Sequence, residues 1–570
     1  MTESTESLPT LRWPARLGLL ALSVLLLSLA LAPAYQFYLA WIGLVPWFFV
    51  IASTRTKKSA FLWSWLGGTL FFFANMWWLW KVTIPGMFAL LIYLGLFWGF
   101  AAWIFVGCRL IPRFHDRSAD FSRVFSVAMI AIVFTALEWL RGNWSMFGNQ
   151  GLPWLYLGNT QSPFLLMCQV ADIGGVYAVT LWVVLVNAAI FSAIVEPRTV
   201  NKLAGPFGLM IAVLFGVAVY GAIRQLAYSN SDARRLSVLV IQPNYPQSNS
   251  GEKGAPLEEI IRFHVETTRA ALLDCDEKGI KVDLIAWSET MMPALNPSMR
   301  QIARGTEFGK LVQGAFDQIA NLANESGAAM IVGGAFSDDW RVRGDEMVAG
   351  DRRNSAYFFE RSGLISETRY DKIHLVPFGE FIPYDSIKFI HAILMKLGPS
   401  GYEDYVLTPG DENALTVFEL ATDRGQPHRF VVPICFEDIV GPLCAKMVRG
   451  PDGTKRADFL VNITNDGWFT GGQMSQHLQA AVFRSIENRV PTARAVNTGI
   501  SGFIDSTGRV FNTVPAKTEG WSVAHLKIDP RVTFYTQHGD LFVEVCAVIT
   551  SIVIVARIVR GKQKTTGTTT

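Results

Sequence analysis

The feature that most constrains this chain is a series of long apolar segments in its first 230 residues, followed by one more near its end. A helix needs about 20 apolar residues to cross the hydrocarbon core of a bilayer. Seven candidate segments precede the polar middle of the chain and an eighth follows it, at about 15–33, 37–53, 60–80, 87–110, 123–140, 174–195, 204–226 and 541–559. The sequence therefore predicts an α-helical membrane domain of eight transmembrane helices.

The composition agrees with membrane-embedded sequence. Hydrophobic residues make up 51% of the chain without counting Gly, and charged residues only 17%, against about 45–50% with Gly and about 25% in soluble proteins. The segment 37–53 is short and contains Pro46, so a buried or re-entrant element is the alternative there. A net charge of +3 gives no basis for nucleic-acid binding, and six cysteines are too few for a disulfide scaffold.

Lysine and arginine near the ends of the segments predict their orientation, because such residues concentrate on the cytoplasmic side. Fifteen lie in the termini and in alternate loops, at 12–16, 55–58, 109–123, 198–202 and 557–564. The opposite short loops hold only Lys81 and Arg141. We expect both termini to be cytoplasmic and residues 231–532 to lie outside. In a Gram-negative cell this places a multi-pass protein in the inner membrane with that region in the periplasm.

Residues 231–532 have the pattern of a soluble α/β domain. Short β-rich runs near 236–242, 282–287, 329–334, 430–435 and 458–464 alternate with amphipathic helical segments at 256–279, 308–326 and 473–489, and 354–363 has the pattern of a hairpin. Alternation of this kind is typical of α/β folds. We therefore divide the chain into a membrane domain (1–230), a catalytic domain (231–532) and a last helix with a basic tail (533–570).

Three residues of this domain carry reactive groups in suggestive positions. Cys435 and Glu289 each follow a predicted strand, where α/β folds commonly place their sites, and Lys372 lies in a mixed charged and apolar segment with two turn formers. Taken singly, Cys435 is more often a buried structural cysteine, and Glu289 a helix cap or a surface group. Together, a carboxylate can act as base, a thiol as nucleophile, and an ammonium can stabilise an oxyanion.

Their surroundings strengthen this interpretation. The segments Trp287-Ser-Glu-Thr, Tyr370-Asp-Lys-Ile-His-Leu-Val-Pro-Phe-Gly-Glu and Pro433-Ile-Cys-Phe-Glu resemble the three signatures of the nitrilase superfamily, in the same order along the chain. A nitrilase-like domain that follows several membrane spans and precedes one more resembles the apolipoprotein N-acyltransferase family. Leu140-Arg-Gly, Gly151-Leu-Pro-Trp and Gly175-Val-Tyr resemble that family's membrane domain.

This resemblance implies an αββα sandwich for the catalytic domain. It implies Glu289 as general base, Lys372 as oxyanion stabiliser and Cys435 as nucleophile. It also implies that Glu380 supports Lys372 and Glu289. Phe436 and Glu437 would shape the pocket beside the nucleophile, and Trp468 would serve in a nearby loop. Phe436 replaces the tyrosine that is usual in the family, so no role of that hydroxyl transfers to this chain.

The expected activity is transfer of a phospholipid acyl chain, through a thioester on Cys435, to the α-amino group of an S-diacylglyceryl-cysteine apolipoprotein. The alternatives are a membrane-anchored amidase or nitrilase that uses water as acceptor, and an inactive nitrilase-like receptor or scaffold. The eight histidines show no metal-binding spacing, so we expect neither a metal nor a cofactor. We expect Cys435 to be a free thiol and His374 to be structural.

Overall fold

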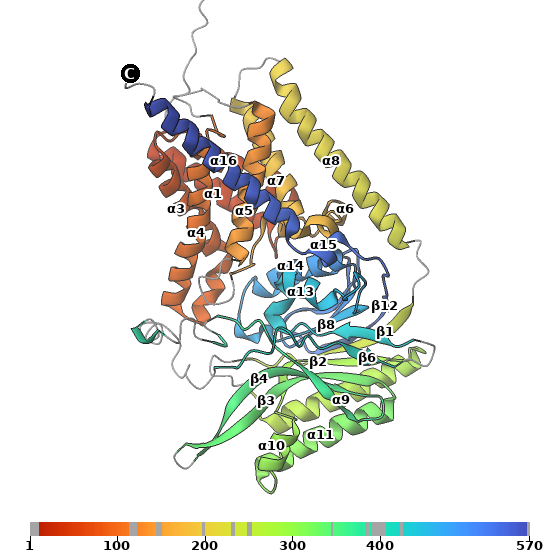
Figure 1. The fold of residues 1–570 in the computed structure, drawn as a ribbon. Helices are drawn as coiled ribbons and strands as arrows, with labels where there is room; N and C mark the ends of the chain where they lie inside the picture. The colour runs from red at the N-terminus through yellow and green to blue at the C-terminus, as the bar shows by residue number, and fades with distance from the viewer. Residues whose placement is uncertain are drawn as a thin grey trace, which may run out of the picture. The chain divides into compact units, whose positions relative to one another are not determined.

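The structure is a computed structural model that describes residues 11–112, 122–143, 151–195, 200–229, 234–247, 254–343, 346–377, 379–381, 387–389, 406–421 and 426–566. The chain forms two compact units. The membrane unit comprises residues 1–80, 84–226 and 538–570, and the α/β unit comprises residues 81–83 and 227–537. Figure 1 draws both units as a ribbon and labels many of their helices and strands.

The membrane unit is helical. Its α-helices are α1 (Trp13–Ala30), α2 (Val45–Ala52), α3 (Lys57–Met76), α4 (Ile84–Gly107), α5 (Arg123–Asn143), α6 (Leu165–Cys168), α7 (Ala171–Val195), α8 (Val200–Ser229) and α16 (Leu541–Thr566), with 3-10 turns η1 (Phe37–Trp41), η2 (Trp77–Lys81) and η3 (Leu157–Gln161) between them. Within the described ranges, six helices are long and apolar enough to cross a membrane: α1, α4, α5, α7, Ala204–Ser229 of α8, and Leu541–Arg560 of α16. The unit therefore has several candidate spans, fewer than the eight predicted.

The two remaining predicted spans differ for physical reasons. The segment 37–53 divides into η1 and the eight-residue α2, which is too short to cross a bilayer. The helix α3 is 20 residues long but opens with Lys57 and Lys58 and includes several Ser, Thr and Gly residues, which lower its hydropathy. Both segments are helical, as expected, and only their length or composition sets them apart from the six.

Two charged side chains of α5 bind neighbouring backbone rather than solvent. Arg141 Nη1 donates to the carbonyl oxygen of Trp154 at 2.7 Å, and Glu138 accepts from the backbone N–H of Leu157 and from the hydroxyl of Thr180, each at 2.7 Å. Buried charges are costly unless they are hydrogen-bonded in this way. These contacts hold residues 154–157, which precede α6, against α5 and α7.

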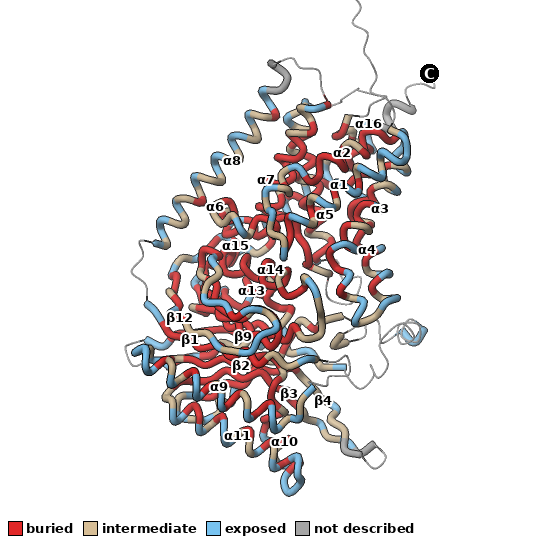
Figure 2. Tube along the Cα trace, turned by 180° about the vertical axis from the view of Figure 1, so that it is seen from behind, coloured by how far each residue is buried: buried red, intermediate tan, exposed pale blue. Residues whose placement is uncertain are grey.

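Helix α8 differs from α7 in its exposure. Its most apolar stretch is 11% buried, whereas that of α7 is 72% buried, and α8 is mostly pale blue and tan in Figure 2. Asp172 of α7 accepts from the Tyr220 hydroxyl and from Arg224 Nε of α8, each at 2.7 Å. Exposed apolar side chains such as Phe215 suit a helix that faces lipid.

The α/β unit contains two sheets of six described strands each. The first has the order β12 (Gly520–Lys527), β1 (Arg235–Gln242), β2 (Leu284–Met292), β3 (Ala329–Arg343), β4 (Glu346–Phe359), β5 (Ile365–Asp371). The second has the order β11 (Val510–Val514), β10 (Ser501–Ile504), β9 (Thr492–Val496), β8 (Phe459–Thr464), β7 (His428–Val431), β6 (Phe418–Leu420). The runs β1–β2–β3 and β7–β8–β9 are parallel, and β2 contacts both β8 and β9, so the two sheets face each other.

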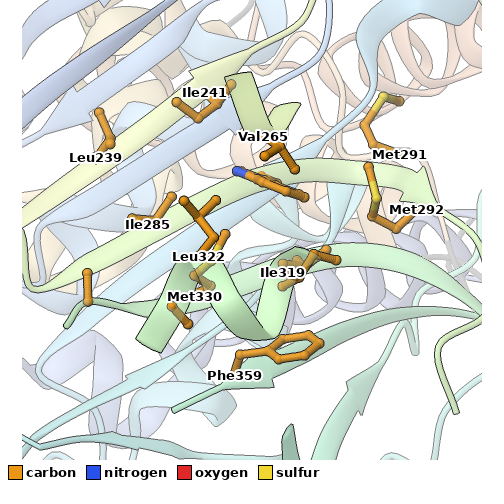
Figure 3. Close-up of a cluster of buried hydrophobic side chains, with 14 of the residues drawn as sticks. Leu239, Ile241, Val265, Ile285, Met291, Met292, Ile319, Leu322, Met330 and Phe359 are labelled. Carbon is orange, nitrogen blue, oxygen red and sulfur yellow. The ribbon is translucent and has the colours of Figure 1, made fainter. Parts of the chain in front are cut away.

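Helices accompany both sheets. They are α9 (Leu257–Glu277), α10 (Pro297–Ile302), α11 (Glu307–Ser326), α13 (Gly441–Val448), α14 (Gln473–Asn488) and α15 (Phe534–His538), with 3-10 turns η5 (Cys435–Ile439) and η6 (Asp466–Trp468). α9 and α11 bury their apolar faces against the first sheet in the cluster drawn in Figure 3. Trp287 lies fully buried in this cluster and donates from Nε1 to Thr268 Oγ1 at 3.0 Å. This core anchors the strand that carries Glu289.

The predicted strands and helices of this unit form, with two corrections near the site. The strand predicted to reach Cys435 ends at Val431, because Pro433 has no N–H to donate to a ladder; Ile434 then makes a single parallel bridge to Ile463. Glu289 lies within β2 rather than after it, at a shift in the register between β2 and β3. Both residues therefore occupy irregular backbone at the ends of ladders.

Candidate active site

Glu289 is positioned by an irregular stretch of β2. The residue after it, Thr290, has a φ of 53°, and the β2–β3 register shifts between Trp287 and Met292. Gly333 of β3 lies directly against this stretch, where a Cβ would come within 2.7 Å of the Cα of Glu289. A glycine at this position is required for the two backbones to approach so closely. The carboxyl group of Glu289 is thereby held in the buried space between the sheets.

Lys372 follows β5 and is fixed on both sides of its own backbone. Its N–H donates to the Asn354 carbonyl at 2.8 Å, and its carbonyl accepts from the Gly410 N–H at 2.9 Å. The side chain is 1% exposed, and Nζ donates to Oε1 of Glu289 at 3.2 Å and to Oε1 of Glu380 at 2.8 Å. One ammonium therefore lies between two carboxylates.

Cys435 begins η5 in a strained conformation. Its φ of 54° is in the left-handed region, which costs a residue other than glycine on the order of 1–3 kcal/mol. Asn462 of β8 holds this turn, donating from Nδ2 to the Pro433 carbonyl at 3.1 Å and to the Cys435 carbonyl at 3.4 Å. The thiol lies close enough to Glu289 for each group to shift the pKa of the other. The turn thus directs the sulfur at the predicted base.

The electrostatics of these groups favour a protonated thiol and a carboxyl able to exchange its proton. Burial, then the Glu289 charge, hold the pKa of Cys435 well above its usual value, although Lys372 opposes them. Burial also raises the pKa of Glu289, against the opposing effect of Lys372. The pKa of Lys372 is raised well above normal, because Cys435 and the two carboxylates outweigh the effect of burial. The lysine therefore stays charged while the other two groups compete for a proton.

Glu380 supports the lysine from a loop. Its Oε1 accepts from Lys372, and its Oε2 accepts from the Val376 N–H at 2.8 Å. The second bond closes the loop back on itself, since Val376 lies four residues before Glu380. We call Glu289, Lys372, Glu380 and Cys435 the Glu289 cluster.

Glu437 lies in the nucleophile turn η5, two residues after Cys435. Its carboxylate accepts from the Tyr370 hydroxyl at 2.9 Å, from the N–H groups of Ile373 and His374 at 2.8 and 2.9 Å, and from the Ile434 N–H at 2.7 Å. It therefore ties the lysine segment to the nucleophile turn. Burial raises its pKa to about 7, although the backbone donors lower it. Phe436 beside it is buried.

Two asparagines that the sequence reasoning missed bind Glu289 directly. Asn354 of β4 donates from Nδ2 to Oε1 of Glu289 at 2.6 Å, and the backbone N–H of Asn465 donates to Oε2 at 2.7 Å. Asn354 lies in the predicted hairpin 354–363, and Asn465 directly follows the predicted strand 458–464. The available signal was a polar residue in an apolar setting, within β4 in one case and directly after β8 in the other.

The remaining predicted residues are placed as follows. Trp468 is half-buried at the end of η6, three residues beyond Asn465. His374 has a pKa lowered to about 4 by burial and by Lys372, so its imidazole is neutral at physiological pH. Cys435 is a free thiol, as expected, and so are Cys275 and Cys444 in the same unit.

Comparisons with known proteins agree with this geometry. Residues 23–189 match the family described as the apolipoprotein N-acyltransferase N-terminal domain, and residues 247–532 match the family described as carbon-nitrogen hydrolase. The fold and site thus define a protein with a carbon-nitrogen hydrolase domain joined to a helical membrane region.

The full-length relatives identify the family more narrowly. The apolipoprotein N-acyltransferase of Allorhizobium ampelinum is 31% identical, covering 89% of this chain and 87% of the relative, and that of Chlorobaculum tepidum is 27% identical, covering 92% of each. This chain belongs to the apolipoprotein N-acyltransferase family, which confirms the resemblance drawn from the motifs. A solved carbon-nitrogen hydrolase from Helicobacter pylori G27 is also similar, at 16% identity, 51% of this chain, 89% of that chain and a TM-score of 0.33; the assignment rests on the sequence relatives.

Proposed function

We propose that this protein is a phospholipid:apolipoprotein N-acyltransferase that works through a thioester on Cys435. The observation that carries the proposal is the Glu289 cluster, in which a buried carboxyl binds a charged lysine and lies near enough to the thiol to affect its pKa. Membership of the apolipoprotein N-acyltransferase family supports acyl transfer over the amidase alternative. The intact reactive groups of the Glu289 cluster argue against an inactive receptor or scaffold.

The first step transfers the acyl group from a phospholipid to the enzyme. Glu289 takes the proton of the Cys435 thiol, and the sulfur attacks the ester carbonyl. Lys372, held in place by Glu380, stabilises the negative charge on the carbonyl oxygen of the tetrahedral intermediate. The C–O bond then breaks, Glu289 returns the proton to the departing glycerol oxygen, and a lysophospholipid leaves an acyl-thioester on Cys435.

The second step delivers the acyl group to an amine. The neutral α-amino group of an S-diacylglyceryl-cysteine apolipoprotein attacks the thioester carbonyl, and Glu289 takes a proton from the nitrogen as the amide forms. The C–S bond breaks, and the sulfur recovers the proton from Glu289. The enzyme returns to its starting state, so the two substrates react in turn in a ping-pong scheme.

The membrane unit gives this scheme a physical setting, because donor and acceptor both hold their acyl chains in a bilayer. We propose that the eight apolar segments all lie in the membrane and that both termini are cytoplasmic, as the lysine and arginine distribution favours. The catalytic domain, 231–532, would then lie in the periplasm of a Gram-negative inner membrane as an αββα sandwich. Residues 1–230 and 533–570 would anchor it.

An impermeant thiol reagent tests this topology. A single cysteine placed in the tail after α16 should stay unlabelled in intact spheroplasts and react once the membrane is opened. Labelling of that cysteine in intact spheroplasts would reverse the orientation.

A two-substrate assay separates the transferase from the amidase alternative. The purified protein in detergent is mixed with a phospholipid and an S-diacylglyceryl-cysteine peptide, and products are identified by mass spectrometry. We expect lysophospholipid and N-acylated peptide in equal amounts, both lost in Cys435→Ala and kept in Cys275→Ala, a buried cysteine of the α9 core. Release of free fatty acid at the same rate with or without the peptide would favour a hydrolase.

A further inference from the structure

A second buried cluster of charges lies next to the nucleophile turn. His477 of α14 is 1% exposed, with Nε2 at 2.7 Å from Oδ1 of Asp438 and Nδ1 at 2.8 Å from Oδ1 of Asp466. Asp438 belongs to η5, the turn that begins at Cys435, and Asp466 opens η6, the turn that ends at Trp468. One imidazole therefore connects the nucleophile turn with the neighbouring loop.

The geometry determines the charge of this imidazole. An ionised carboxylate only accepts hydrogen bonds, so both ring nitrogens must donate, which requires an imidazolium. Arg494 of β9 donates from Nη1 to Oδ2 of Asp438 and is also buried. Two carboxylates then face two cations, and the group that we call the His477 cluster (Asp438, Asp466, His477 and Arg494) is electrically neutral. A neutral histidine would leave one buried negative charge in excess, which is costly.

The neighbouring charged side chains do not neutralise Asp466 in place of His477. Arg484 and Glu487, on the same helix, pair with each other at 2.7 Å. Cys435 is affected by the Asp466 charge, and Cys444 of α13 by the Asp438 charge. Oδ2 of Asp466 has no hydrogen-bond partner within the described part of the chain. The charge of Asp466 is therefore offset by His477 more directly than by any other side chain in this group.

The titration of the cluster agrees with the geometry. Asp438 and Asp466 together outweigh the effect of burial and raise the pKa of His477 to about 9. Burial raises the pKa of Asp438, but His477 and Arg494 lower it below its usual value. His477 and Asp438 therefore both remain charged at neutral pH.

We infer that His477 is a positioning residue whose imidazolium holds the nucleophile turn and the Trp468 loop in register and neutralises Asp438 and Asp466 beside Cys435. This inference rests on Cys435 being the nucleophile of the proposed function. Without the imidazolium, an unbalanced negative charge next to the sulfur would disfavour the thiolate, which is the attacking species. The residue acts through Cys435 and touches no substrate in this role.

The test measures the reactivity of Cys435 itself. Purified full-length protein reacts with iodoacetamide across a pH series, and the rate at the Cys435 peptide is followed by mass spectrometry. In His477→Gln we expect the pH midpoint of alkylation to rise, with alkylation at neutral pH slower by about tenfold for each pKa unit. His264→Gln is the matched control, because His264 is also buried and its Nδ1 bonds a backbone carbonyl, that of Ile260, at 2.7 Å.

A second substitution separates charge from shape. His477→Gln combined with Asp466→Asn restores neutrality, so its alkylation midpoint should return toward that of the wild type. A wild-type midpoint in His477→Gln would overturn the inference, and so would a double variant as slow as the single one. If His477→Gln does not accumulate, the neutral double variant should; its absence as well would count against the charge balance. Alkylation needs no acyl donor, so failure of acyl transfer in the wild type would be seen separately.

Discussion

Two clusters of buried charge lie within the α/β unit, and they behave differently. The Glu289 cluster has one cation, Lys372, between two carboxylates and a thiol, and burial raises the pKa of Glu289. The His477 cluster has two cations for two carboxylates, and the pKa of Asp438 is lowered despite equal burial. The number of cations decides whether a buried acid keeps a fixed charge or can exchange its proton. Proton-transfer chemistry needs an acid that can exchange its proton. An acid with a fixed charge suits a permanent structural contact.

The largest effect is expected where the exchangeable proton is removed. Glu289→Gln keeps the shape of the side chain and an oxygen that can accept from Asn354, but it abolishes the base. Thioester formation on Cys435 should fall by about 10²–10⁴-fold. The rate is measured by quenched mass spectrometry after mixing with phospholipid, with membrane abundance as control. A wild-type rate would show that Glu289 is not the base.

Removal of the single cation should have the next largest effect. Lys372→Met takes away the charge that faces the developing oxyanion, which is worth on the order of 10²–10³-fold in rate. It also leaves Glu289 and Glu380 without the ammonium between them. Because the Lys372 charge lowers the pKa of Cys435, the pH midpoint of Cys435 alkylation by iodoacetamide should rise. If the variant acylated Cys435 as fast as the wild type, Lys372 would be structural.

In the His477 cluster, removal of one charge should mainly lower the stability of the fold. Asp438→Asn leaves His477 and Arg494 facing one carboxylate, and breaking a buried ion pair costs on the order of 3–5 kcal/mol. We expect a clearly lower melting temperature in detergent, whereas Glu289→Gln should melt near the wild type. Equal melting temperatures for wild type and Asp438→Asn would remove the distinction between the clusters.

The smallest expected effect is the pH dependence of that stability. The pKa of His477 is raised from 6.5 to about 9 on folding, so its contribution is fully present below pH 6.5 and is lost as the pH rises through 9. The melting-temperature difference between wild type and His477→Gln should therefore shrink across this range. Taking the difference cancels other buried groups that titrate nearby, such as Glu437 and Lys455. A difference independent of pH would indicate a neutral imidazole.

Much of the α/β unit could be predicted from the sequence, because its strands and helices have clear periodicity and buried cores. The predicted reactive residues Glu289, Lys372 and Cys435 are adjacent in the structure, as their motifs indicated. The positions of the strand ends were harder to predict, since β7 stops before Pro433 and β2 continues past Glu289 through a register shift.

The supporting residues could not be predicted in the same way. Asn354 and Asn465 reach Glu289 across sequence separations of 65 and 176 residues, and His477 reaches Asp438 across 39. Such contacts depend on how two sheets and a helix pack, which local pattern does not encode. In the membrane unit, hydropathy located the helices, and six of the eight predicted spans are long and apolar enough to cross a membrane within the described residues.

The central claim is that Cys435 carries the acyl group, and intact-mass analysis of the protein after mixing with phospholipid alone tests it most directly. We expect one added acyl mass per protein, located on the Cys435 peptide, removed by neutral hydroxylamine and matched by an equal amount of lysophospholipid. Acyl mass on another residue, or its persistence in Cys435→Ala, would contradict the thioester mechanism.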